Sequence, residues 1–477
     1  MEFLTTMGLE VHCELSTKTK IFCSCSTEFG GEPNTHVCEV CSGMPGTLPV
    51  VNESVVEYAI RTGIATNCQI TRYNKFDRKN YFYPDLPKAY QVSQLYLPIC
   101  QNGHIDIDVN GTKKAIRIKE IHMEEDAGKL IHDPYDDSTL VDYNRCGVPL
   151  LEIVSEPDFE SGDEVIAYLT KLRAILQYID VSDCKMEQGS LRADVNLSIR
   201  PVGSTELGTR TEMKNINSFK AIARAIEGER ERQIDLIEDG GRVVQETRRW
   251  DDGKGKSYAM RSKENAQDYR YFPEPDLVPI EISDEWIERV KNALPELPTE
   301  KKARYLKEYD LPEYDVDIIT GSKYLVNIFE KALAVCDQPK EVSNWILGEV
   351  LRLASETATE YENISFDAAN LGKLILILKN KVINRTTAKE VFEKMFSENT
   401  DPEKYIKEHK LEMVNDTSAV KNVVEKVLAA NPKSIEEYKA GNEKVTRFLM
   451  GQCMKELKGK ADPASVNEAI AEALSKI

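Results

Sequence analysis

The stretch Leu191-Arg-Ala-Asp-Val-Asn-Leu-Ser-Ile-Arg200 alternates apolar and polar residues without interruption. Successive side chains of a β-strand point to opposite faces of the sheet, so this stretch has one apolar face and one polar face. The segment Leu9–Leu15 alternates in the same way and places Glu10, His12 and Glu14 on its polar face. Both segments predict half-buried strands of a sheet whose open face carries charged side chains.

Helical patterns interrupt these strands. Apolar residues recur at helical spacing from 165 to 179, and Asp163 has the position of an N-cap. A second helix is expected from about residue 218 to 239, where Gly240-Gly241 ends it. This mixture of helices and strands predicts an α+β domain with a mixed or antiparallel sheet.

The pattern becomes almost wholly helical beyond about residue 284. We therefore expect three domains, an α+β domain over residues 1–292, an all-α domain over 293–405 and a small all-α tail over 406–477. The 477 residues are 41% hydrophobic and 30% charged, which supplies enough apolar mass for several cores.

Composition also restricts the class of protein. No apolar run approaches the ~20 residues of a membrane-spanning helix, and the N-terminal segment lacks a signal-peptide pattern. The odd number of cysteines, 11, favours a reducing, cytoplasmic setting over a disulfide framework. A net charge of −18 excludes a protein that coats nucleic acid by charge alone.

Four cysteines are close in sequence and form two short pairs, Cys23 with Cys25 and Cys38 with Cys41. Two such pairs can supply the four thiolate ligands of a tetrahedral zinc ion. The alternative is four unrelated thiols, but the closeness of the pairs favours zinc. An ion with four protein ligands would be structural, because no position is left for a substrate.

Acidic side chains form a second candidate metal site. Glu10 and His12 share a strand face, residues 122–126 read His-Met-Glu-Glu-Asp, and Glu152 follows an apolar run. Carboxylates and an imidazole are ligands for a hard divalent ion such as Mg²⁺. The alternative, that each acidic run is a solvated surface, remains open for any run taken singly.

The sequence contains only indirect indications of a phosphate-binding site. The residues Gly255-Lys256-Ser257 end like a Walker A loop, but Trp250 stands where the loop needs its first glycine. The strand face of Arg192 and Asp194 and the later Lys214 offer instead the mixture of cations and carboxylates that suits a magnesium-bound polyphosphate. A ladder of exposed cross-strand ion pairs would look the same.

Two further segments, Asp77–Pro84 and Asp268–Asp276, combine charges with aromatic residues. Segments of this kind line a cleft or cap a core. Core packing is expected for Phe82 and Phe272, while the neighbouring charges indicate the wall of a site.

The segment Val141–Ile153 closely resembles the signature of the GatB family. Members of this family are subunits of the tRNA-dependent amidotransferases, which convert Glu-tRNA(Gln) or Asp-tRNA(Asn) to Gln-tRNA(Gln) or Asn-tRNA(Asn). Other segments agree with this family in order along essentially the whole chain, and the last of them resembles the tail shared with the YqeY family. They are Gly8–Leu15, Asp77–Pro84, His122–Lys129, Met186–Arg192, Lys214–Phe219, Gln245–Trp250, Met260–Pro275 and Gly451–Lys460.

The resemblance implies a cradle-like sheet domain related to glutamine synthetase and the guanidino kinases. In this cradle, ATP with Mg²⁺ would phosphorylate the side-chain carboxylate of the amino acid on the tRNA, and ammonia would displace the phosphate. The chain shows no amidase signature, so the ammonia would come through a channel from a separate amidase subunit that hydrolyses glutamine. A small third subunit would complete a heterotrimer.

The resemblance also assigns site residues. The magnesium set would be Glu10, His12, Glu125 and Glu152, although alternation along the strand would put Glu124 on the face of His122. The nucleotide candidates are Ser190, Arg192, Asp194 and Lys214. Lys79 and Tyr81 resemble residues that line the ammonia route, and the four cysteines match the zinc-bearing members.

The tail is the expected tRNA-binding part. Residues 439–460 carry six basic side chains against two acidic ones, and we expect Lys455, Lys458 and Lys460 to contact tRNA phosphates. Two other functions remain open. One is a non-catalytic zinc-bearing tRNA adaptor, and the other is a stand-alone ATP-dependent carboxylate–amine ligase that uses free amino acids.

Overall fold

The computed structural model describes residues 2–132, 136, 138–214, 216–262, 269–413, 417–439, 445–457, 461 and 463–475. Its contacts divide the chain into two units, residues 1–298 and 299–477. Helix α4 (Asp284–Ala293) packs against α1 (Glu53–Ala65) and so belongs to the first unit. In the described ranges, no helix is both long and apolar enough to cross a membrane.

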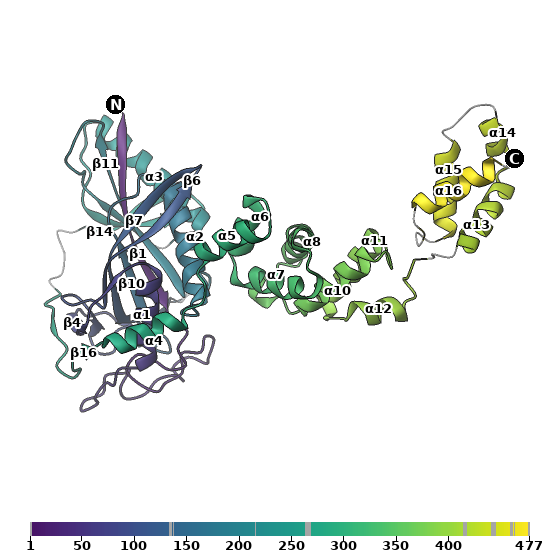
Figure 1. Cartoon of the computed structure of the whole chain (residues 1–477). Helices are drawn as coiled ribbons and strands as arrows, with labels where there is room; N and C mark the ends of the chain where they lie inside the picture. The colour runs from purple at the N-terminus through teal and green to yellow at the C-terminus, as the bar shows by residue number, and fades with distance from the viewer. Residues whose placement is uncertain are drawn as a thin grey trace. The chain divides into compact units, whose positions relative to one another are not determined.

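The first unit is built on a nine-stranded sheet with the order β14-β13-β12-β11-β1-β10-β7-β6-β2 (Figure 1). Its strands are β1 (Phe3–Glu14), β2 (Gln69–Ile70), β6 (Cys100–Val109), β7 (Thr112–Glu125), β10 (Pro149–Ser155), β11 (Leu191–Pro201), β12 (Thr211–Lys214), β13 (Glu246–Asp251) and β14 (Lys256–Ser262). Strands β12 and β13 pair in parallel, and the other described neighbours are antiparallel. This confirms the α+β class.

Smaller sheets flank the large one. The three-stranded sheet has the order β15-β4-β5 and joins β15 (Phe272–Pro273), β4 (Asp77–Asn80) and β5 (Tyr90–Ser93). The others pair β16 (Ile280–Glu281) with β3 (Tyr73–Asn74), and β8 (Lys129–His132) with β9 (Thr139–Asp142). Contrary to the expectation of core packing, Phe82 is 78% exposed and Phe272 is 42% exposed. Both rings therefore lie at the surface of the unit.

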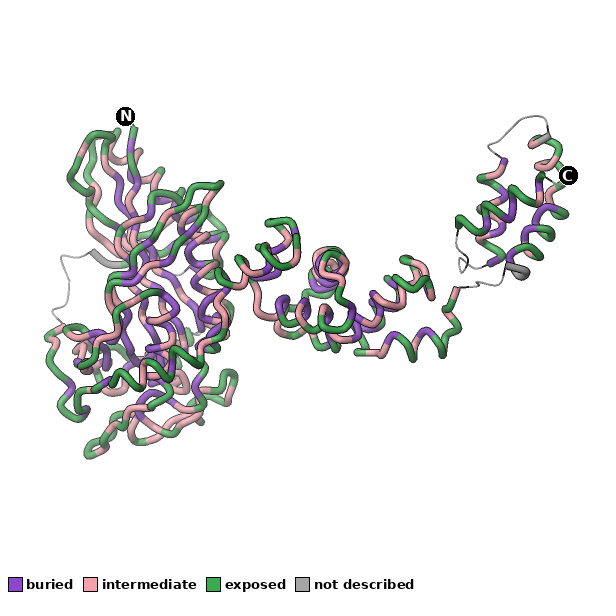
Figure 2. The backbone as a smooth tube through the Cα atoms, viewed as in Figure 1, coloured by how far each residue is buried: buried purple, intermediate pink, exposed green. Residues whose placement is uncertain are grey.

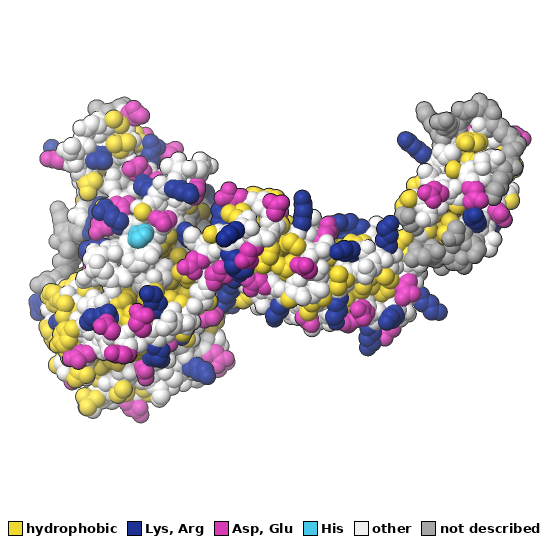
Figure 3. Space-filling view, in the orientation of Figure 1, with side chains coloured by type: hydrophobic (Ala, Val, Ile, Leu, Met, Phe, Trp, Pro, Cys, Tyr) yellow, Lys and Arg dark blue, Asp and Glu magenta, His cyan; other side chains and the backbone are white. Residues whose placement is uncertain are grey.

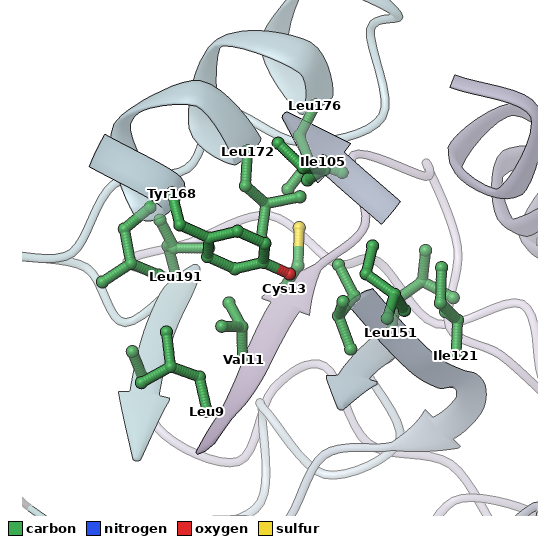
Figure 4. Close-up of a cluster of buried hydrophobic side chains, with 14 of the residues drawn as sticks. Leu9, Val11, Cys13, Ile105, Ile121, Leu151, Tyr168, Leu172, Leu176 and Leu191 are labelled. Carbon is green, nitrogen blue, oxygen red and sulfur yellow. The ribbon is translucent and has the colours of Figure 1, made fainter. Parts of the chain in front are cut away.

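One face of the large sheet is buried by helices. Helix α2 (Gly162–Tyr178) packs against β6, and α3 (Phe219–Glu238) packs against β11. Figure 4 shows that the side chains of Tyr168, Leu172 and Leu176 lie over the apolar face of β1, which carries Leu9, Val11 and Cys13. Burying a large apolar side chain contributes roughly 1.5–3 kcal/mol, so this layer fixes which face of the sheet stays open.

The helix starts follow from capping. Ser161, rather than the expected Asp163, is the N-cap of α2, because its extended backbone lets its side chain accept a hydrogen bond from Glu164 N. Asp163 lies in the first turn, where a carboxylate interacts favourably with the helix dipole. Ser218 caps α3, which ends at Glu238 before Gly240, so the helix lies within the expected range of residues 218 to 239.

The described part of the second unit contains helices and no strand. These are α5 (Pro298–Glu308), α6 (Glu313–Thr320), α7 (Lys323–Cys336), α8 (Pro339–Trp345), the π-helix η2 (Ile346–Val350), α9 (Leu351–Glu356), the 3₁₀ helix η3 (Tyr361–Asn363), α10 (Ala368–Lys379), α11 (Arg385–Glu398), α12 (Pro402–Glu408), α13 (Thr417–Ala430), α14 (Pro432–Lys439), α15 (Val445–Glu456) and α16 (Pro463–Leu474). On the face of α7–α12 drawn in Figure 3, basic side chains lie among acidic ones.

Two clusters within this unit pack separately. Helix α10 packs against α7, and helices α13, α15 and α16 bury a core of their own around Leu449 and Ile470 (Figure 2). The expected boundary between residues 405 and 406 falls inside α12. That helix starts at Pro402 because Asp401 caps it by accepting a hydrogen bond from Lys404 N.

Candidate active site

The open face of the large sheet carries a row of polar residues that crosses four strands. The row runs from His122 on β7 through Glu152 and His12 to Arg192 on β11, each opposite the next in the antiparallel register. Residues opposite one another point to the same face, so the register gathers side chains from distant parts of the sequence.

A first acidic group forms at this row. His12 Nε2 lies 3.5 Å from Glu124 Oε1 and 3.9 Å from Glu152 Oε1. One ligand atom from each of the three residues lies within 4.8 Å of the others. Two carboxylates and an imidazole at this spacing can share one divalent cation.

A second acidic group lies on β1, β11 and β12, and its residue on β1 is two positions from His12. It consists of Glu10, Asp194 and Glu212, whose ligand atoms also lie within 4.8 Å of one another. Lys214 Nζ donates to Asp194 Oδ2 at 2.8 Å and lies 3.0 Å from Glu212 Oε1. Burial, followed by the charges of neighbouring carboxylates, raises the pKa of Glu10. Lys214 balances only part of this negative charge, so the group also suits a divalent cation.

Lys79 on β4 brings a positive charge to the first acidic group. Burial acts to lower the pKa of its ammonium, but the carboxylates of Glu124 and Glu152 outweigh that effect and the pKa is raised. The ammonium nitrogen lies 5.0 Å from the ring centroid of Tyr269 and 5.7 Å from that of Tyr81. Burial also raises the pKa of Tyr81 to about 12, so its hydroxyl stays protonated at neutral pH.

Both groups contribute to the lining of one cavity of about 710 Å³. Glu152 of the first group, Glu10 of the second and the side chain of Lys79 line it, together with His122 and Tyr271. Small-molecule sites typically occupy roughly 300–1,000 Å³, so this space is large enough for a small-molecule ligand.

Glu125 lies outside both groups and Glu10 lies in the second, so of the expected magnesium set only His12 and Glu152 come together, with Glu124 in the place expected for Glu125. Neighbouring residues of a strand point to opposite faces, and Glu124 is the one that faces His12. The Glu125 carboxylate accepts hydrogen bonds from Lys88 Nζ at 2.5 and 2.7 Å and from Val92 N at 2.9 Å. Both of its oxygens are therefore engaged on the buried side of the strand.

Two of the four expected nucleotide-binding residues make contacts elsewhere. Arg192 Nη2 donates to Asp126 Oδ2 at 2.8 Å. Ser190 Oγ donates to Asp183 Oδ1 at 2.6 Å, within the turn that leads into β11. Only the pair Asp194 and Lys214 comes together at the second acidic group.

The site residues expected from the sequence do not include Glu124, Glu212, Tyr269 or Tyr271. Alternation along the strands is sufficient to place the two glutamates on the polar face. The two tyrosines lie in a segment that is rich in aromatic residues. Its composition does not predict which strand the segment contacts.

The four cysteines come together as the two short pairs predict. One sulfur from each of Cys23, Cys25, Cys38 and Cys41 lies within 4.8 Å of the others. The fully buried Lys20 donates to His36 O at 2.7 Å, and its Nζ lies 3.6 Å from Cys41 Sγ. Four thiolates around Zn²⁺ carry an excess of negative charge, so a buried ammonium beside them fits a zinc site.

In the tail, Lys455 is exposed on α15. The other two lysines expected to contact RNA, Lys458 and Lys460, lie outside the described residues.

Comparison with known proteins gives consistent matches over the chain. Residues 5–288 match the family model described as GatB/GatE catalytic domain, and residues 327–474 match the one described as GatB domain. A Lachnoclostridium phytofermentans protein, named as the B subunit of aspartyl/glutamyl-tRNA(Asn/Gln) amidotransferase, is 64% identical over 472 residues, which are 99% of each chain. Proteins of the same name from Caldicellulosiruptor bescii and Thermoanaerobacter pseudethanolicus are 58% and 56% identical, each over 100% of both chains.

Proposed function

The chain belongs to the GatB family, and on that basis we propose that it is the subunit of a tRNA amidotransferase in which the amide is made. The relatives' name points to Glu-tRNA(Gln), Asp-tRNA(Asn) or both as substrates. A free carboxylate is a poor acyl donor, so its phosphorylation by ATP would create the leaving group that ammonia displaces.

The observation that carries this proposal is the pair of acidic groups beside one cavity of about 710 Å³. His12, Glu124 and Glu152 would hold one Mg²⁺, and Glu10, Asp194 and Glu212 a second. Magnesium, when bound, would neutralise the charge of the polyphosphate and of the transferring oxygens.

The chain's own cations have separate tasks in this proposal. Lys214 lies at the second group, 2.8 Å from Asp194, where it can contact a phosphate that enters with the metal. Lys79 lies at the first group, where its ammonium can hold the substrate carboxylate beside Glu124 and Glu152. Fixed positions for both reactants lower the entropic part of the barrier.

The proposed partners would supply the activities that this chain would lack. An amidase subunit would release ammonia from glutamine and pass it through a channel, with Lys79 and Tyr81 near its exit, and a small third subunit would complete a heterotrimer. Zn²⁺ on the four cysteines would be structural. Basic residues of the tail, Lys455 among them, would hold the tRNA, and the cysteine content favours a cytoplasmic setting.

The test is tRNA-dependent phosphate release from ATP by the reconstituted complex, with ammonium as the amine donor. Glu124→Gln should lower the rate by about 100-fold, because it removes a ligand of the Mg²⁺ that would neutralise transition-state charge. The matched control is Glu160→Gln, since the Glu160 side chain is 75% exposed and lies outside both acidic groups.

Each alternative has its own result. A complex that binds the tRNA but releases no phosphate from ATP would identify an adaptor. Amidation of free glutamate without tRNA would identify a stand-alone ligase. A Glu124→Gln complex as active as the control would refute the metal site.

A further inference from the structure

Two segments far apart in the sequence form one wall of the cavity. Strand β4 pairs with β15 so that Phe272 is opposite Arg78, and Asn80 N donates to Tyr269 O at 2.9 Å. At the other end of the contact, Glu274 N donates to Phe76 O at 2.9 Å. The segment Tyr269–Asp276 therefore lies along the whole length of β4.

A buried ion pair fastens this segment to β4. Arg78 Nε and Nη2 lie 2.6 and 2.8 Å from the two carboxylate oxygens of Glu274, and Nη2 also lies 3.1 Å from Asp276 Oδ2. The Glu274 side chain is 1% exposed and that of Arg78 is 19% exposed. Bidentate pairs of this kind fix orientation as well as distance.

Aromatic contacts complete the fastening. The Arg78 guanidinium lies 4.3 Å from the ring centroid of Tyr90 and 5.7 Å from that of Phe272. Phe272 belongs to the attached segment and Tyr90 to the neighbouring β5. Arg78 thus contacts both sides of the junction, through its charge and through the faces of two rings.

The attached segment carries two of the rings beside Lys79. Tyr269 is the nearer one, with its centroid 5.0 Å from Nζ, and it makes edge contacts with Tyr81 at 5.7 Å and with Tyr271 at 6.1 Å. Lys79 has four methylene groups that could let the ammonium swing away. The rings of Tyr269 and Tyr81, with centroids 5.0 and 5.7 Å from Nζ, restrict that movement.

We propose that Arg78 and Glu274 are positioning residues, whose ion pair fixes Tyr269–Asp276 on β4 and thereby keeps the Lys79 ammonium at Glu124 and Glu152. This inference rests on the proposed amidation, because only there does the position of Lys79 affect a rate. Arg78 and Glu274 themselves touch no reacting group in this scheme. Their effect passes through the tyrosine rings to Lys79.

The experiment uses the reconstituted complex with Glu274→Gln, Arg78→Lys and Tyr269→Leu. Arg78→Lys keeps the charge and loses the two-pronged geometry, and Tyr269→Leu removes the nearest ring while leaving the ion pair intact. Each variant is assayed for kcat and for the KM of ATP. The reactivity of Lys79 toward a small acylating reagent is measured by mass spectrometry.

All three variants should lower kcat by about tenfold, since displacement of a catalytic group by about 1 Å costs up to 100-fold. The KM of ATP should stay within twofold, because the nucleotide candidates that come together, Asp194 and Lys214, lie on β11 and β12. Acylation of Lys79 should become several-fold faster. The control Arg224→Met removes a bidentate pair to Asp252, at 2.8 and 2.6 Å, and should change none of these quantities.

Unchanged kcat and unchanged Lys79 acylation in Glu274→Gln and Tyr269→Leu would overturn the inference. So would a parallel change of kcat, KM of ATP and melting temperature, which would show a general loss of structure. If the wild-type complex made no amide, the proposed function would fail. The acylation of Lys79 needs no enzymatic activity, so it would still decide whether the ion pair positions Lys79.

Discussion

Replacing Glu124 and Glu125 separately by glutamine should affect the stability of the metal-free protein very differently. The two residues are neighbours on β7, but they face different surroundings. Glu124 meets Glu152 and His12 on the open face, and Glu125 meets Lys88 on the other. The two substitutions are chemically identical, so they form a matched pair.

Glu125→Gln should be strongly destabilising. The side chains of Lys88 and Glu125 are 11% and 3% exposed, and Nζ lies 2.5 Å from one carboxylate oxygen and 2.7 Å from the other. Removing one partner of a buried pair leaves an uncompensated charge and costs about 3–5 kcal/mol. In a unit of this size the loss corresponds to about 5–10 °C in melting temperature.

Glu124→Gln should leave the metal-free protein as stable as the wild type or slightly more stable. Burial, followed by the charge of Glu152, raises the pKa of Glu124, which means that its ionised form is unfavourable in the fold. A neutral glutamine removes that penalty. The same variant should lose the part of any Mg²⁺-induced rise in melting temperature that comes from the first acidic group, while the second group keeps its own.

Differential scanning calorimetry of the three proteins, with EDTA and with Mg²⁺, measures both effects. Equal melting temperatures for Glu125→Gln and the wild type would refute the reasoning about the buried pair. A lower melting temperature for Glu124→Gln in EDTA, or a full magnesium response in that variant, would refute the assignment of Glu124 to a metal site.

Three further outcomes are expected. Metal analysis of the wild type should find about one zinc per chain, and the Cys38→Ser, Cys41→Ser double variant should have lost it; unchanged zinc content would exclude the four-cysteine site. Burial, followed by Asp126, raises the pKa of Glu14 from 4.5 to about 8. The folded protein therefore holds a proton that the unfolded chain releases, so stability should fall as the pH rises from about 4.5 to about 8. In Glu14→Gln, denaturant unfolding across that range should give a flatter pH dependence, and an identical slope would contradict the shift. Finally, Lys455→Glu should raise the KM for tRNA and weaken its salt dependence, whereas an unchanged KM would show that the exposed face of α15 does not meet the RNA.

Much of the candidate site could be predicted from local pattern. Alternation along Leu9–Leu15 and Leu191–Arg200 identifies the polar faces of β1 and β11, because the direction of a strand side chain depends only on its position in the strand. The same rule selects Glu124 over Glu125, and the structure agrees with the rule rather than with the residue carried over from the family. Likewise, the spacing of the cysteines suffices to predict that their sulfurs meet.

Other features depend on strand order and on long-range contact. That Glu10 faces Asp194 while His12 faces Glu152 follows from the register of β1 with its two neighbours, and alternation does not specify a register. The pairing of Arg78 with Glu274 joins residues 196 positions apart. Local sequence determines which side chains can serve a site, but only the folded chain decides which of them meet, because register and long-range pairing are set by how the whole core packs.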